Sequence, residues 1–70
     1  MNQTVIGNSI KNLMKKNNYT KEKMAREIGV TMNELEKILN GKKELSADQV
    51  LYITKIFNLS IEECVKIFFK

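Results

Sequence analysis

Residues 20–41 read TKEKMAREIGVTMNELEKILNG, and this stretch decides the fold. Apolar residues recur at helical spacing on both sides of Gly29-Val30, which predicts two short helices, Thr20 to Ile28 and Thr31 to about Asn40. Glycine suits the left-handed conformation that often ends a helix, so Gly29 is expected to end the first of them. The segment therefore reads as two helices joined by a tight turn.

The turn itself carries three further signals. Thr31 and Glu34 have the spacing of a capping box, in which side chain and backbone of each residue bond to the other. Ala25 is small enough to let the second helix approach closely, and Val30 is expected to plug the space under the turn. Helices joined this tightly cross at a steep angle, which predicts a helix-turn-helix over about residues 20–40. In that motif the second helix lies in the major groove of DNA.

Three more helices are predicted around this pair. One runs from about Thr4 to Asn17, and capping boxes at Ser46 and Ser60 open two others. No segment alternates with the period of a strand. The side chains expected to face the core in these three helices are, in turn, Ile6, Ile10, Leu13 and Met14; Val50, Leu51, Ile53, Ile56 and Phe57; and Ile61, Cys64, Val65 and Phe68. The fold class expected is all-α, a five-helix bundle forming one domain over residues 1–70.

Composition excludes several classes of protein. The 70 residues include no His and a single Cys, so neither an internal disulfide nor a zinc site is expected. No nucleophile–base pair is visible, so we expect no enzyme, no cofactor, no metal and no small-molecule substrate. No apolar run approaches the roughly 18 residues that span a bilayer, and no signal peptide is recognisable, so no membrane association and a cytoplasmic location are expected.

The stretch YTKEKMAREIGVTMNELEKILNGKKELSADQVLYITKIFNLSIEE resembles the Cro/phage-repressor (Xre-type) helix-turn-helix family. The resemblance extends from Ile6 to about Val65. The motifs that carry it are Ala25, Gly29-Val30-Thr31, Asn40-Gly41-Lys42 and Leu59-Ser60-Ile61-Glu62-Glu63. It implies a lambda-repressor-like DNA-binding domain.

Some positions depart from the family pattern. The family usually has Gln where Lys21 stands, and a cation suits a backbone phosphate at least as well. The family also pairs an Arg with a Glu at the positions of Met14 and Leu39. Replacing both members of an ion pair by apolar side chains tends to be neutral or stabilising, so this departure supports the alignment.

The second helix of the motif is expected to present Met32, Asn33, Glu36 and Lys37 to DNA bases. Asn33 suits adenine, Lys37 suits guanine, and Met32 suits a thymine methyl group. Glu36 either accepts from the N4 amino group of cytosine or pairs with Lys37 or Lys43 beside the backbone.

The residues expected to contact the DNA backbone are Lys21, Lys23, Asn40, Lys42 and Lys43. The excess positive charge, +4 for the whole chain, lies within residues 1–30, which include the start of the motif. A solvated, lysine-rich helix surface is the alternative explanation for these lysines.

The C-terminal residues Ile67, Phe68 and Phe69 cannot all enter one small core, because consecutive residues point to different helix faces. We expect them to form a homodimer interface, which would place two recognition helices on a palindromic site in double-stranded DNA. The alternative is a frayed end. The expected function is a sequence-specific transcriptional regulator, a repressor of phage or bacterial type. The competing hypothesis is an antirepressor-like or antitoxin-like interaction module that kept the fold without DNA binding.

Overall fold

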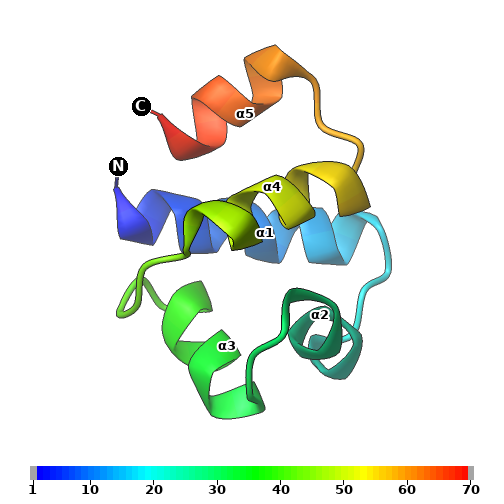
Figure 1. The fold of residues 1–70 in the computed structure, drawn as a ribbon, viewed down its shortest axis with the longest axis vertical. Coiled ribbons are helices and arrows are strands. Elements are labelled where there is room, and N and C mark those ends of the chain that lie inside the picture. Colours follow the sequence, from blue (N-terminus) through cyan, green and yellow to red (C-terminus); the bar gives the residue numbers. More distant parts are fainter. Residues whose placement is uncertain (1, 70) are drawn as a thin grey trace.

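The computed structural model describes residues 2–69 and confirms the all-α class (Figure 1). In Figure 1, α1 and α4 cross the middle of the molecule, α5 lies above them, and α2 and α3 lie below. The helices are α1 (Gln3–Lys16), α2 (Lys21–Ile28), α3 (Met32–Leu39), α4 (Ala47–Ile56) and α5 (Ile61–Phe68). None of the helices described is long and apolar enough to cross a bilayer.

Local signals set the helix boundaries. A side-chain oxygen of the N-cap residue accepts a hydrogen bond from a backbone N–H of the first turn in all five helices. The expected capping boxes at Thr31, Ser46 and Ser60 are all present. Asn18, Gly41 and Asn58 adopt the left-handed conformation just after α1, α3 and α4. The predicted starts of all five helices and the predicted ends of the first three therefore lie within about two residues of the observed bounds.

All five helices contribute to one hydrophobic core. Its buried members are Ile6, Ile10, Met14, Met24, Ala25, Ile28, Leu35, Ile38, Leu39, Ile53 and Phe68. Helix α1 packs against α3 and α5, while α2 packs against α3 and α4. The helix-turn-helix is thus held from behind by α1 and α4, and Val30 packs against the core as expected for the plug under the turn.

Gly7 sets the distance between α1 and α3. A Cβ at this position would lie 2.8 Å from the carbonyl oxygen of Ile38 and closer still to that of Leu39. Both neighbours are backbone atoms of α3, so they cannot rotate out of the way as a side chain could. The absence of a side chain at Gly7 therefore allows α1 to support α3 at close range.

The apolar stripes of α4 and α5 are narrower than predicted. Leu51 is 61% exposed, Ile61 is 85% exposed and Val65 is 47% exposed, so these three are not core residues. The first turn of α5 lies at the outer edge of the bundle, where Ile61 has little to pack against (Figure 1). In the last turn, Phe68 is fully buried.

Burial also corrects the expected dimer interface. Phe68 is 0% exposed and belongs to the core of the single chain, so it cannot contribute to a contact between subunits. Ile67 is half-buried and packs against the same core. Phe69 is 67% exposed. Successive helical residues diverge by about 100°, which sends Phe68 inward and leaves its neighbour outside.

Candidate nucleic-acid interface

Helix α3 has an exposed leading edge and a buried rear. Thr31, Met32 and Asn33 are exposed to solvent at its start. Behind them Leu35 is 0% exposed and Ile38 is 2% exposed, so the helix is locked against the core. This is the arrangement that the helix-turn-helix prediction requires: a firmly held helix whose first turn is open to a ligand.

The four residues expected to meet bases lie together on this accessible side. Met32 is 40% exposed, Asn33 and Lys37 are exposed, and Glu36 is partly exposed. Their spacing places Glu36 and Lys37 one turn after Met32 and Asn33, so the four share one helix face.

An ion pair links this face to α2. The Lys21 ammonium lies 2.6 Å from Oε1 of Glu36, and the side chains are 51% and 43% exposed. The expectation that Glu36 pairs with Lys37 or Lys43 is therefore wrong. Lys21, the first residue of α2, reaches across the joint of the motif, a tertiary neighbour that sequence spacing does not indicate.

A second ion pair joins α3 to the loop that follows it. The Lys43 ammonium lies 2.5 Å from Oε2 of Glu34, and Oε1 of the same carboxylate accepts the backbone N–H of Thr31 at 3.0 Å. The hydrogen bond from Lys43, followed by that from the Thr31 backbone, lowers the pKa of Glu34 from its ordinary value of 4.5 to about 2. Glu34 is therefore ionised at neutral pH and holds both the helix start and the loop.

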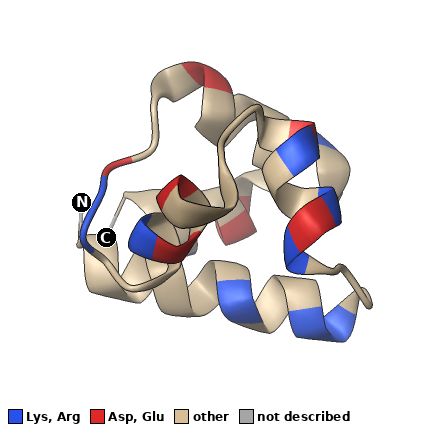
Figure 2. Ribbon diagram, turned by 90° about the horizontal axis from the view of Figure 1, so that it is seen from below, with Lys and Arg blue, Asp and Glu red and all other residues tan. Residues whose placement is uncertain are grey.

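Charges of both signs consequently alternate over α2 and α3. Figure 2 views this end of the molecule and shows blue and red segments side by side on these two helices, whereas α1 carries blue alone. Of the five residues expected at the DNA backbone, Lys21 and Lys43 already have carboxylate partners. The positive surface that would meet phosphates is thus partly compensated from within the protein.

The three remaining residues expected at the backbone flank α3 on either side. The Lys23 ammonium lies 4.7 Å from the centre of the Tyr19 ring, a cation–π contact at the start of α2. Asn40 and Lys42 follow α3, where backbone bonds from Gly41 to Ile38 and from Lys42 to Lys37 fix the path of the chain. The structure thus places lysines before and after the exposed helix.

Lys11 is a residue of this surface that the sequence reading missed. Its ammonium donates a 3.4 Å hydrogen bond to Oδ1 of Asn40, which brings α1 to the end of α3. The two residues are far apart in sequence, and only the close approach of α1 and α3 joins them. The position of Lys11 off the apolar face of its helix was the one available signal.

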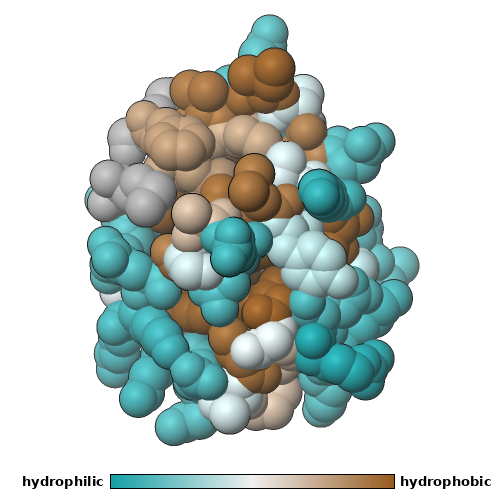
Figure 3. Space-filling view, viewed as in Figure 1, coloured by the Kyte–Doolittle hydropathy of each residue, from teal (hydrophilic) through white to brown (hydrophobic). Residues whose placement is uncertain are grey.

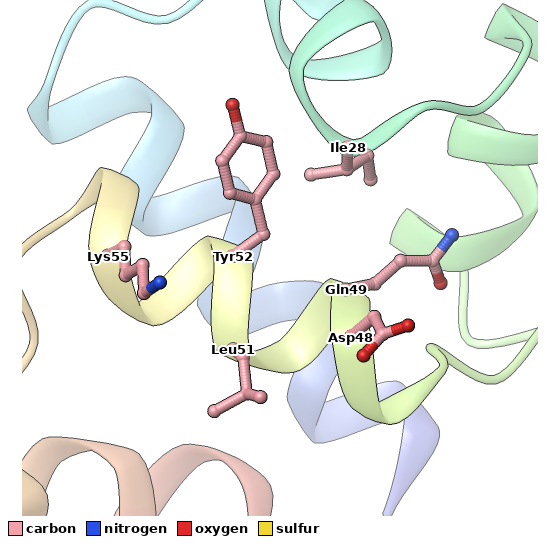
Figure 4. Close-up of a pocket in the computed structure, with 6 residues that line it drawn as sticks. All are labelled: Ile28, Asp48, Gln49, Leu51, Tyr52 and Lys55. Carbon is pink, nitrogen blue, oxygen red and sulfur yellow. The ribbon is translucent and has the colours of Figure 1, made fainter.

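Two hollows lie away from this surface. One, of about 350 Å³, lies between the end of α2 and α4, with Tyr52, Gln49 and Asp48 around it (Figure 4). Figure 4 shows Leu51 pointing away from these residues, toward α5. The other, an apolar groove of about 380 Å³ between α4 and the end of α5, is lined by Leu45, Ala47, Val50, Leu51 and Phe69. Figure 3 shows hydrophobic residues gathered over this upper part of the molecule.

No site of metal-ligand type was found within residues 2–69, and none of their polar or charged residues is buried. Ligand chemistry in this part of the chain therefore rests on surface side chains. The α2–α3 surface carries the exposed Met32, Asn33 and Lys37 together with the flanking lysines and is the candidate site.

Comparison with known proteins agrees with this assignment. A helix-turn-helix family model matches residues 10–64, which cover most of the chain and the whole α2–α3 motif. Searches of curated proteins and of solved structures gave no significant match. The matched family is one of DNA-binding regulators that are generally not enzymes. The chain belongs to the Cro/C1-type helix-turn-helix family.

Proposed function

We propose that this protein is a sequence-specific transcriptional repressor of phage or bacterial type, acting in the cytoplasm on double-stranded DNA. The observation that carries the proposal is the exposed leading edge of α3, anchored by a buried rear and flanked by lysines. Phosphate contacts supply affinity in such complexes, while a few side chains on the recognition helix supply specificity. Cro-type family membership supports the repressing role.

Within this proposal, Asn33, Lys37, Met32 and Glu36 contact base edges in the major groove. Asn33 and Lys37 suit adenine and guanine respectively, since an amide can donate and accept while an ammonium only donates. Neither side chain takes part in an ion pair or side-chain hydrogen bond among the contacts described, so both are available to DNA. Met32 offers an apolar surface to a thymine methyl group.

Backbone contacts in the proposal come from Lys21 and Lys23 at the start of α2, and from Asn40, Lys42 and Lys43 after α3. One group precedes the recognition helix in the chain and the other follows it. Lys23 and Lys42 form no ion pair among the described residues, so their phosphate contacts displace no carboxylate.

We place the homodimer contact on the apolar groove between α4 and α5. Leu51 and Phe69 line this groove and are 61% and 67% exposed, and Val65 on α5 is 47% exposed. Exposed apolar residues gathered in this way are typical of protein–protein contact sites. Phe69 keeps the role expected for it, while Leu51 and Val65 replace the buried Phe68.

The same features also support the competing function, a protein-interaction module of antirepressor-like or antitoxin-like type. Carboxylates on α3 weaken attraction to phosphates, and the apolar groove between α4 and α5 could hold a different protein. The two functions differ in salt dependence. A DNA binder loses affinity with a slope of about 0.9 per phosphate contact on a double-logarithmic plot, whereas an interaction module shows little DNA affinity at any salt.

The deciding experiment is selection of bound sequences from random duplex DNA, followed by titration at several salt concentrations. We expect recovery of a palindromic site. Asn33→Ala and Lys37→Ala should each weaken binding to it by about 1–3 kcal/mol and relax preference at one base position. Lys66→Ala, which makes the same charge change as Lys37→Ala but on α5, is the control and should leave base preference intact. The proposal is contradicted if the recovered DNA shows no preferred sequence, or if base preference is unchanged in both α3 variants.

A further inference from the structure

The two glutamates of α3 are held in different ways. Both oxygens of Glu34 are occupied, one by the Thr31 backbone N–H and the other by Lys43. Glu36 has one ion-pair partner, Lys21, at its Oε1. Glu34 is therefore fixed in place, whereas the contact of Glu36 can be exchanged for another without loss of the helix cap.

The Lys21–Glu36 pair is also easy to open. Its side chains are 51% and 43% exposed, so water already solvates both charges and separating them costs little. Each member has an alternative partner in a DNA complex. Lys21 stands at the first residue of α2, where backbone N–H groups and the helix dipole also favour a phosphate. Glu36 lies on the face of α3 that carries Met32 and Asn33.

We propose that the Lys21–Glu36 ion pair is an exchange device that makes DNA binding by this chain depend on a cytosine. The inference rests on the proposed DNA-binding function and deepens it. On the right site, Glu36 leaves Lys21 and accepts a hydrogen bond from the N4 amino group of cytosine, and Lys21 turns to a backbone phosphate. Both charges exchange one partner for another, so nothing is left unpaired.

On other sequences the exchange fails. Guanine O6 and thymine O4 are acceptors and repel a carboxylate at that position, and the N6 donor of adenine lies beside the acceptor N7, which repels it as well. Lys21 must then either stay with Glu36, which loses a phosphate contact, or leave an unpaired carboxylate in a groove lined by phosphates. Either outcome weakens binding to incorrect duplexes. The glutamate that opposes DNA binding in general thus favours one base in particular.

The test is Glu36→Gln, measured on the selected operator and on a random duplex. Glutamine removes the charge while keeping the shape, so Lys21 is released. Binding to the random duplex is expected to rise by up to about fivefold, the worth of one exposed ion pair. Binding to the operator is expected to fall, because a charge-assisted bond to cytosine is lost. The base preferred at that position should also change from cytosine to adenine, which glutamine recognises.

Two controls separate this mechanism from a general charge effect. Glu62→Gln makes the same change of net charge on α5, in an exposed residue with no ion pair among those described, and is expected to leave the ratio of operator to random affinity unchanged. In a Lys21→Ala background, Glu36→Gln releases no lysine, so the part of its gain on random duplex that comes from Lys21 is expected to be lost and only the relief of repulsion between the carboxylate and the phosphates remains. Melting temperatures confirm that each variant is folded.

The outcomes are distinct. An equal increase on both duplexes, with cytosine preference retained or absent, overturns the exchange while leaving the DNA-binding function in place. Failure of the unmodified chain to bind any duplex at low salt overturns both. A fall in discrimination together with the change from cytosine to adenine supports the exchange.

Discussion

Gly7→Ala is the substitution that most directly tests how α1 supports α3. Ordinary contact of a Cβ begins at 3.4 Å, but a Cβ here would lie 2.8 Å from the Ile38 carbonyl oxygen and closer to that of Leu39. The two helices must therefore separate by several tenths of an ångström. Because both opposing atoms belong to the backbone of α3, the recognition helix itself has to move.

The expected magnitude is a balance of two effects. Alanine in a helix interior is more favourable than glycine by about 1 kcal/mol. Overpacking of a close contact typically costs about 1–3 kcal/mol. The net expectation is a loss of about 1 kcal/mol in the free energy of unfolding, which lowers the melting temperature of a domain of this size by about 4–8 °C.

Thermal and urea unfolding measure this loss, and amide chemical shifts of Ile38, Leu39 and Asn40 report the movement of α3. Asn8→Ala is the matched control, since Asn8 is exposed on the same helix and gains helix propensity without a clash. Its stability is expected to rise by about half a kcal/mol. If Gly7→Ala stabilised the protein by the full propensity difference and left the α3 shifts unchanged, the close approach would be refuted.

Two further predictions concern the core and the ion pairs. Phe68→Ala is expected to lower the free energy of unfolding by about 3–5 kcal/mol because Phe68 is fully buried, and Phe68→Leu is expected to lower it less. Phe69→Ser is expected to leave urea unfolding of the single chain nearly unchanged, because Phe69 is exposed. Similar small effects at both positions would contradict the assigned burial. The pKa of the Glu34 carboxyl is about 2 in the folded chain against an ordinary 4.5, so its stabilising effect is complete above about pH 4.5 and is lost as the pH falls toward 2. Glu34→Gln, which keeps a capping-box residue, should make the melting temperature depend less on pH over that range. A Glu34 carboxyl that titrates near 4.5 by NMR in the unmodified chain would contradict the prediction.

The fold was predictable because its signals are local. Capping boxes at Thr31, Ser46 and Ser60 and the left-handed residue Gly41 mark helix ends within a few residues of chain. Periodicity then identified the buried sides of α1, α2 and α3, except that Leu13 of α1 was expected in the core and is only partly buried. It failed in α5, where Ile61 has the right spacing but lies beyond the edge of the bundle, since periodicity does not tell how far a neighbour extends.

The exposed face of the candidate site was also predictable, but its electrostatics were not. Met32, Asn33 and Lys37 follow from helix geometry once the buried face is known. The partners of Glu36 and Asn40 come from other helices, Lys21 and Lys11 respectively, and depend on how the helices cross. Gly7 likewise has no local signal, because its role is defined only by the backbone of α3 on the opposite side.

Short helices have a consequence for how such a regulator can be switched off. Helices α2, α3 and α5 have 8 residues each, well below the length at which an isolated helix persists in water. The exposed side chains of α3 are therefore held in place only while α1 stays packed against α3 and α4 against α2. A protease cut within α1 or α4 is therefore expected to displace α3 although it breaks no bond in that helix.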